Sequence, residues 1–231
     1  MGAMWKNAGK SAAAAAKGKI ISKMAKEIIV AAKGGADLSG NPRLRMAVDA
    51  ARRLSVPRDT IERAIKKGSG QLDGPVNYDA VTYEGFGPHR VPVIVECLTD
   101  NRNRTATNIR VLFRKFQLGN TGSVSWDFNH VGMIIAAADE GAADAETAAI
   151  EAGAQDFETG EEGTMVFFSE PTDLDAVSKA LAAQKWTVTS SKMGWKAKNL
   201  MNLDEAAMAE VTAFLQEIDA DDDVQEIYTA L

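Results

Sequence analysis

The sequence predicts an α+β protein with an all-helical N-terminal domain and two ferredoxin-like α/β domains of the split βαβ type, the third domain being inserted into the second. Up to Gly68, apolar residues recur at helical spacing, and strand patterns begin only beyond it. Residues 133–192 read β-α-β-β-α-β by themselves, as a split βαβ domain does. Residues 80–128 read β-β-α-β, and a helix and strand expected within 204–229 would complete that domain. The predicted domains are therefore residues 1–74, residues 75–131 with 200–231, and residues 132–199.

Length and composition limit the class of protein. A chain of 231 residues, with 45% hydrophobic and 25% charged residues, is long enough for two or three small globular domains. No apolar run approaches the roughly 20 residues of a membrane span, so we expect no membrane contact. The single cysteine, Cys97, excludes an internal disulfide framework and a cysteine-rich zinc site, and it fits a reducing, cytoplasmic location. Because there are only two histidines besides, we expect neither a metal nor a cofactor.

Each of the three N-terminal helices has a sequence signal of its own. The first, over residues 20–33, has an apolar stripe with lysines on the opposite side. The second begins at Asn41-Pro42, where an N-cap residue is followed by proline at the first helical position. The third follows Pro57 and ends at Gly68, a residue type common at helix C-termini. Together they predict a small helical unit with its apolar stripes inside and its charges outside.

A linker rich in turn residues, over 71–77, separates this unit from the elements beyond it. Short β-rich runs predict strands there, and 3.6-residue periodicity predicts helices. We expect strands at 80–84, 91–99, 123–128, 132–137, near Phe157, 165–169, 187–192 and 224–229. We expect helices at 105–116, 144–152, 174–184 and 204–218.

Charge is distributed unevenly along the chain. Residues 1–70 hold fifteen Lys and Arg against five Asp and Glu, a net charge of +10. Residues 71–135 are balanced, and residues 136–231 hold five Lys against 21 acidic residues, a net charge of −16. A basic end is attracted to polyanions and an acidic end is repelled by them. The pattern therefore predicts separate roles for the two ends.

The first candidate site is the basic exterior of the helical unit, together with the basic arm that precedes it. Lysines and arginines that neutralise phosphates release counterions, so such a surface binds nucleic acid with a steep salt dependence. The sequence has no zinc-finger, RRM or KH signature, and we therefore expect contacts to the backbone rather than to base edges. Trp5 in the arm would either stack on a base or simply pack. The residues expected at this site are Trp5, Lys6, Lys10, Lys17, Lys19, Lys23, Lys26, Arg43, Arg45, Arg52, Arg53, Arg58, Arg63, Lys66 and Lys67.

The second candidate site lies between a buried strand and a helix, and it consists of Asn101, Arg102, Asn103 and Arg104. Backbone N–H groups at a helix N-terminus and two guanidinium groups would hold a phosphate. The alternative is that the asparagines cap the helix while the arginines pair with acidic neighbours, namely Glu84, Glu96 or Asp100. The segment Gly85–Arg90 either lines the same cleft or is a simple hairpin turn.

No catalytic constellation withstands inspection. Gly9-Lys10-Ser11 resembles the end of a P-loop but lacks the first glycine of that motif. Asp219, Asp221 and Asp223 have EF-hand-like spacing without the loop glycine or the final glutamate. Cys97 lies in an apolar strand pattern, where a thiol is usually inert. We therefore expect neither an enzyme nor a small-molecule substrate.

A series of motifs runs nearly from end to end of the chain: Trp5 with its basic arm, Gly18-Lys19, Asn41–Arg45, Val56–Asp59, Ile61–Lys67, Tyr83–Pro88, Val95–Thr105, Gly122–Val124 and Asp222–Tyr228. In combination they resemble the YebC/PmpR family, which includes the mitochondrial translational activator of cytochrome c oxidase. The resemblance implies a helical first domain and two α/β domains around a cleft. It also implies a DNA-binding transcriptional regulator or a ribosome-associated translation factor, without catalytic activity.

These observations predict a cytoplasmic, non-enzymatic, nucleic-acid-binding regulator of gene expression. Its partner would be duplex DNA or ribosomal RNA, and the ribosome itself is a further candidate. The alternative is a protein-binding adaptor that acts through its acidic third domain. The salt dependence of nucleic-acid binding separates the two, because an adaptor working through an acidic face would bind cationic partners and ignore nucleic acid.

Overall fold

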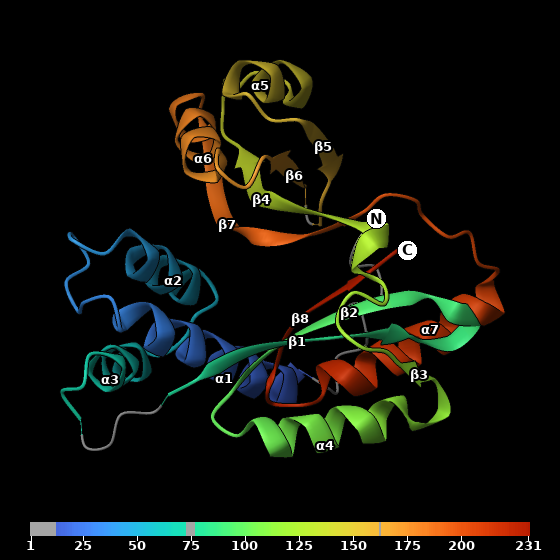
Figure 1. Cartoon of the computed structure of the whole chain (residues 1–231). Coiled ribbons are helices and arrows are strands. Elements are labelled where there is room, and N and C mark those ends of the chain that lie inside the picture. The colour runs from blue at the N-terminus through green and yellow to red at the C-terminus, as the bar shows by residue number, and fades with distance from the viewer. Residues whose placement is uncertain (1–12, 73–76, 162) are drawn as a thin grey trace. The chain divides into compact units, whose positions relative to one another are not determined.

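The computed structural model describes residues 13–72, 77–161 and 163–231, which form two compact units (Figure 1). One unit comprises Ser125–Asn202 with Tyr228–Leu231. The other comprises the described residues up to Val124 together with Leu203–Ile227. The second unit is discontinuous in sequence, because Ser125–Asn202 of the first, inserted unit lies between its two segments.

The discontinuous unit contains three N-terminal helices and a four-stranded sheet with its own helices. Its elements are α1 (Ala13–Ala32), α2 (Pro42–Arg53), α3 (Arg58–Gly68), β1 (Asp79–Phe86), the 3₁₀ turn η3 (Pro88–Arg90), β2 (Pro92–Thr99), α4 (Arg102–Leu112), the 3₁₀ turn η4 (Phe113–Lys115), β3 (Gln117–Leu118), α7 (Glu205–Asp219) and β8 (Val224–Thr229). The inserted unit contains the 3₁₀ turn η5 (Ser125–Asp127), β4 (Phe128–Ala138), α5 (Ala145–Ala152), β5 (Asp156–Thr159), β6 (Thr164–Ser169), α6 (Leu174–Ala183) and β7 (Trp186–Ala197).

Helices α1, α2 and α3 form a helical module around a core of their own, which includes Ile28, Leu44 and Ile61. Asn41 caps α2 by accepting a hydrogen bond from the Leu44 N–H at 3.0 Å, as its sequence position predicts. Its amide nitrogen also donates to the carbonyl of Ala31 at 2.8 Å, which ties the start of α2 to the end of α1. The module is thus held by apolar stripes inside and by a cap that spans two helices.

Gly68, at the end of α3, has a role beyond ending the helix. A Cβ at this position would collide with the carbonyl oxygen of Ile29 and would lie 2.7 Å from the Cβ of Ala32. The lack of a side chain therefore lets α3 lie directly against α1.

The sheet of the discontinuous unit has the strand order β3-β1-β2-β8, with β1 antiparallel to β2 from Asp79↔Thr99 to Phe86↔Pro92. Helices α4 and α7 accompany it. An edge-to-face contact between Phe113 and Phe214, with centroids 5.1 Å apart, joins η4 to α7. Strand β8 comes from the far end of the chain, so this sheet is complete only when both sequence segments are present.

The inserted unit has a sheet of order β5-β6-β4-β7, in which every pairing recorded is antiparallel. Its core includes Ile134, Ala148, Phe167, Leu181 and Trp186, contributed by strands and by both helices. The succession of elements is the β-α-β-β-α-β of the split βαβ fold. The predicted fold class is confirmed: a helical N-terminal region followed by two α/β sheets, one inserted into the other. The predicted domain boundaries stay a prediction.

One predicted strand is wrong. Residues 123–127 do not pair as a strand. Gln117–Leu118 forms β3 instead, and the chain then makes the turn η5 before β4 begins at Phe128. The cause is Glu84, whose buried carboxylate accepts hydrogen bonds from the backbone N–H groups of Gly122 and Val124, both at 2.9 Å. Backbone groups that bond to a side chain in this way are not available for a strand ladder.

The helix expected at 105–116 is shifted towards the N-terminus. It begins at Arg102, since Asn101 is its N-cap, and it ends at Leu112 before the 3₁₀ turn. Among the described residues, no helix has the length and apolar character that crossing a bilayer requires.

Candidate nucleic-acid interface

The basic residues of α2 and α3 lie on the outside of the helical module. All but one of them are exposed, and Lys67 is partly buried: Arg43, Arg45, Arg52, Arg53, Arg58, Arg63, Lys66 and Lys67. Arg52 and Arg53 occupy the last turn of α2, and Lys66 and Lys67 the last turn of α3. Positive charge at a helix C-terminus stabilises the helix through its dipole, so these residues also favour the local structure.

Two of these arginines have acidic partners on their own helices. Arg52 lies 3.4 Å from Asp49, and the Nε of Arg58 lies 2.7 Å from Glu62. Such exposed pairs contribute little free energy and are screened by salt, so a phosphate can replace the carboxylate at small cost. The exterior of α2 and α3 therefore remains cationic.

The N-terminal part of the predicted surface is only partly described. Lys17 is exposed and Lys19 is half-buried on α1. The predicted residues Trp5, Lys6 and Lys10 lie outside the described residues.

Lys23 and Lys26 do not belong to the open basic surface, which corrects the prediction. The Nζ of Lys23 lies 2.7 Å from Asp219, and the Nζ of Lys26 lies 2.8 Å from Asp223. Their side chains are only 17% and 13% exposed. Lys26 also donates to the backbone carbonyl of Asp222 at 2.6 Å. The face of α1 that the sequence predicts to be open to solvent instead packs on acidic residues 196 and 197 positions further along the chain.

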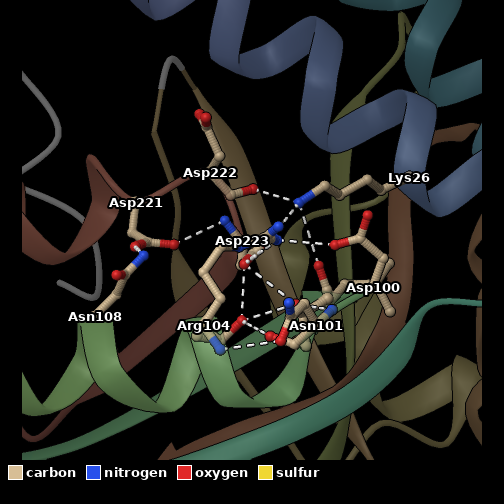
Figure 2. A network of polar contacts seen from close by, with 11 residues as sticks. Lys26, Asp100, Asn101, Arg104, Asn108, Asp221, Asp222 and Asp223 are labelled. Atoms are coloured by element: carbon tan, nitrogen blue, oxygen red, sulfur yellow. Dashed lines mark hydrogen bonds and ion pairs between the residues drawn. The ribbon is translucent and has the colours of Figure 1, made fainter.

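Asp223 is the centre of a polar network that joins α1, β2 and α4 (Figure 2). Its side chain is 4% exposed and accepts hydrogen bonds from Lys26 at 2.8 Å, Arg104 at 2.8 Å and the hydroxyl of Thr105 at 2.7 Å. Burial alone would raise the pKa of this carboxyl. The hydrogen bonds from Lys26, Arg104 and Thr105 outweigh burial and lower the pKa of Asp223 to about 2.

At the second candidate site, Asn101 caps the helix and the arginines pair with acidic residues, which is the alternative to a phosphate site that the sequence left open. Asn101 caps α4 by accepting from the Arg104 N–H at 3.1 Å. Arg104 pairs with Asp223 and, at 2.9 Å, with Asp100, while Arg102 lies 3.0 Å from Asp79. Asn103 is exposed. Of the three acidic partners that the sequence suggested for these arginines, Asp100 forms an ion pair with Arg104.

A hollow of about 590 Å³ lies beside this network. Its lining includes Lys26, Arg104 and Tyr78, but also Asp100, Asp221 and Asp223. Because several carboxylates face the same space as the cations, the potential there opposes a phosphate. The part that Arg104 can play in anion binding is correspondingly small. Arg102, with 65% of its side chain exposed, is better placed.

The segment Gly85–Arg90 does not line that hollow. It contributes instead to a second one, of about 330 Å³, together with Phe116, Gln117 and Glu210. Sequence reasoning missed Phe116 and Glu210 here, because both come from elements that reach this place only through the packing of η4 and α7. The partial exposure of the Phe116 ring is the feature that indicates a binding site here, and only the structure shows it.

Cys97 is buried in β2, and burial raises the pKa of its thiol to about 12, with smaller contributions from Asp221 and Asp223. A thiol in that state is a poor nucleophile.

The side chain of Asp221 accepts hydrogen bonds from the backbone N–H of Asp223 and from the side chain of Asn108, so it stabilises the loop before β8. Within the described ranges, no three His, Cys, Asp or Glu side chains are grouped so as to hold a metal ion.

Comparisons with known proteins place this geometry in a family. Residues 4–71 match the TACO1/YebC protein N-terminal domain, and residues 78–231 match the TACO1/YebC second and third domain. A probable transcriptional regulatory protein of Pseudomonas fluorescens strain Pf-5 is 60% identical over 232 residues, which cover 100% of this chain and 99% of that protein. A probable transcriptional regulatory protein of Bdellovibrio bacteriovorus is 47% identical over the full length of both.

A solved structure shows the same fold. The crystal structure of a conserved hypothetical protein from Aquifex aeolicus superimposes with a TM-score of 0.84 at 36% sequence identity, covering 96% of this chain and 93% of that one. The resemblance read from the sequence motifs is thus confirmed over almost the whole chain. The chain belongs to the TACO1/YebC family.

Proposed function

We propose that this protein is a cytoplasmic, non-enzymatic regulator of gene expression that binds nucleic acid through the exterior of its helical module. The observation that carries the proposal is the set of exposed bases on α2 and α3: Arg43, Arg45, Arg52, Arg53, Arg58, Arg63 and Lys66. The relatives named probable transcriptional regulatory proteins support a regulatory role.

The contact is with the phosphate backbone. Arginine forks on two short helices suit bidentate contacts with phosphate oxygens, which set position and orientation without reading sequence. If about six phosphates are neutralised, the logarithm of the binding constant falls with the logarithm of the salt concentration with a slope of about −5 on duplex DNA and about −4 on a single strand.

The inserted unit assists by repulsion. Residues 125–202 hold thirteen Asp and Glu against five Lys, so a polyanion avoids this part of the chain. Together with the basic helical module, this charge separation orients the protein on its target. Arg102, Asn103 and the cap residue Asn101 offer a second, weaker anchor, with Arg104 largely occupied by its carboxylate partners.

The target is either duplex DNA, as for a transcriptional regulator, or ribosomal RNA within the ribosome, as for a translational activator. The experiment compares binding of the purified protein to ribosomes, to ribosomal RNA and to random duplex DNA across a salt series. Preference for ribosomes or RNA assigns the translational role, and preference for duplex DNA assigns the transcriptional role.

The same experiment includes a charge-reversed variant with Arg45→Glu and Arg63→Glu. We expect it to bind roughly tenfold more weakly or worse, with a salt slope shallower by about 2. The matched control, Lys179→Glu with Lys185→Glu, changes the net charge equally but in the inserted unit. It should weaken binding much less, because it adds only long-range repulsion, which salt screens. Equal loss in both variants would contradict a localised contact surface.

If these experiments contradict the proposal, the alternative is a protein-binding adaptor that acts through its acidic inserted unit. It predicts no salt-dependent binding to any of the three polyanions. It also predicts binding to a cationic protein that is lost when acidic residues of α5 are neutralised.

A further inference from the structure

The hollow formed by Gly85–Arg90 lies in the discontinuous unit and differs in chemistry from the basic helical surface. It measures about 330 Å³ and is lined by aromatic rings, two basic side chains and one carboxylate: Phe86, Phe116, His89, Arg90 and Glu210, with Gly87, Pro88 and Gln117. None of these residues belongs to α1, α2 or α3. Whatever binds here therefore makes contacts separate from those of the helical module.

Phe214 of α7 supports both walls of this hollow. A Cβ on Gly87 would lie 2.8 Å from the Phe214 ring, so only glycine lets the loop lie against it. On the other side, the Phe116 ring meets the Phe214 ring edge-on with centroids 4.6 Å apart. Phe116 is nevertheless 37% exposed.

The loop itself is held in an unfavourable backbone conformation. His89 has φ 54° and Arg90 has φ 60°, two successive left-handed residues neither of which is glycine. This conformation places the Arg90 guanidinium 5.1 Å from the centroid of the Phe86 ring and the Nε2 of His89 2.9 Å from the Glu210 carboxylate. Residues held in such sparsely populated backbone conformations cluster at active sites and ligand-binding sites.

We propose that this hollow binds one nucleotide of a single-stranded nucleic acid. The base stacks on the partly exposed ring of Phe116 and against the Arg90–Phe86 pair, and the adjoining phosphate meets the Arg90 guanidinium. Base stacking on aromatic rings and on guanidinium planes is the common mode of single-strand recognition. This inference rests on the proposed function and assigns to it a second contact of a different kind.

Size and chemistry restrict the ligand. A volume of about 330 Å³ is at the small end of ligand pockets, which suits a mononucleotide better than a dinucleotide cofactor. A base inside a duplex has both faces covered by its neighbours, so only an unpaired nucleotide can enter. An acidic peptide would use Arg90 but leave the rings of Phe86 and Phe116 without a partner. The carboxylate of Glu210 offers a hydrogen-bond acceptor for the exocyclic amino group that adenine carries.

The test is a titration of the full chain with adenosine 5′-monophosphate, followed by two-dimensional amide NMR, with ribose 5-phosphate as the probe that lacks the base. We expect millimolar or tighter binding of the nucleotide, with shifts centred on residues 86–90, 116–117 and 210. Ribose 5-phosphate should bind at least about fivefold more weakly, because it lacks the stacking contribution.

Two variants remove the two halves of the site. Arg90→Gly removes the guanidinium and also relieves the left-handed backbone at this position, so the substitution adds no backbone strain. Phe116→Ala removes the stacking face. We expect each to weaken nucleotide binding roughly tenfold. The control is Arg114→Gln, which removes one positive charge from an exposed neighbour outside the hollow and should leave binding unchanged.

Each outcome is decisive. Equal binding of the nucleotide and ribose 5-phosphate, or shifts centred on α2 and α3, overturns the nucleotide site. Absence of nucleotide binding, with polymer binding intact, overturns the site but leaves the proposed function in place. Nucleotide binding that Arg90→Gly abolishes supports the site. If Arg45→Glu with Arg63→Glu then leaves polymer binding unaltered, the nucleotide site stands and the proposed contact surface on α2 and α3 is wrong.

Discussion

Asp223 is a buried side chain that determines which of the predicted functional residues are available to bind a ligand. It binds Lys26 of the helical module and Arg104 of α4, with further hydrogen bonds from Thr99 and Thr105. Two cations that the sequence offered for phosphate contact therefore hold α1 and α4 to the residue that precedes β8. A buried carboxylate that accepts from four donors stabilises the packing of the elements that carry them. Its removal leaves the charged partners without a counter-charge.

Replacing this carboxylate by an amide should cost stability. Asp223→Asn removes the charge that Lys26 faces, and Lys26 has only 13% of its side chain exposed. We expect the free energy of unfolding to fall by about 2–3 kcal/mol, below the range for fully buried pairs because Arg104 is half-exposed. Urea denaturation measures this, with Asp222→Asn, at an exposed position, as the control expected within about 0.5 kcal/mol of the unaltered protein.

The same carboxyl predicts a pH dependence of stability. Its pKa is about 2 in the folded protein, lower than the roughly 3.9 of an unfolded aspartate. The unfolded state therefore binds the proton first as pH falls, so a contribution of about 2 kcal/mol, fully present above pH of about 4, is lost between about pH 4 and pH 2. Urea midpoints measured across this range should show a shallower decline for Asp223→Asn. Parallel curves for the two proteins would refute the assignment.

At the scale of single elements, two glycines in helices of the module differ in whether the packing requires them. Gly68 lies where a Cβ would meet the carbonyl of Ile29, whereas Gly18 in α1 has no atom within 4 Å of such a Cβ. Both are glycines in helices, and helix propensity alone would favour alanine at each. Only the packing separates them.

This difference is directly testable. Gly68→Ala should destabilise the protein by about 2 kcal/mol, because α3 must move away from α1. Gly18→Ala should stabilise it by about 0.5–1 kcal/mol through helix propensity. Thermal unfolding of the two variants against the unaltered protein measures both. Equal effects would mean that α3 is not pressed against α1 as described.

Element prediction succeeded where the signal is local. The cap at Asn41 and the proline at Pro42 set the start of α2. Asn101 caps α4 in the same way, although the sequence pattern predicts that this helix begins only at Thr105. Element prediction failed over residues 123–127, where the backbone bonds to the side chain of Glu84 about 40 positions earlier. No pattern inside a short window reveals a partner at that distance.

At the scale of the whole molecule, charge is divided between the parts. Residues 133–195 hold twelve Asp and Glu against three Lys. Removing them changes the net charge of the chain from −6 to +3. The β3-β1-β2-β8 sheet keeps all its strands, since each lies outside the deleted segment.

Deleting residues 133–195 and closing the gap with a short flexible linker should therefore strengthen polyanion binding at low salt. We expect a gain of severalfold that shrinks as the ionic strength rises, because long-range repulsion is screened over about a Debye length. Fluorescence anisotropy with a labelled duplex measures this. Unchanged affinity at every salt concentration would show that the inserted unit has no electrostatic role.

The sequence by itself determined the fold class, the family and the separation of charge along the chain. Each of these depends on local periodicity, on helix caps or on composition. These features can be recognised in the sequence without knowing which residues are in contact in the folded protein. Only the tertiary structure decided which cations are available. It removed Lys23 and Lys26 from the open surface, occupied Arg104, and assembled Phe86, Arg90 and Phe116 around a hollow. These outcomes depend on contacts between residues far apart in the chain, such as Lys26 with Asp223, and a sequence pattern does not contain the distances that create them.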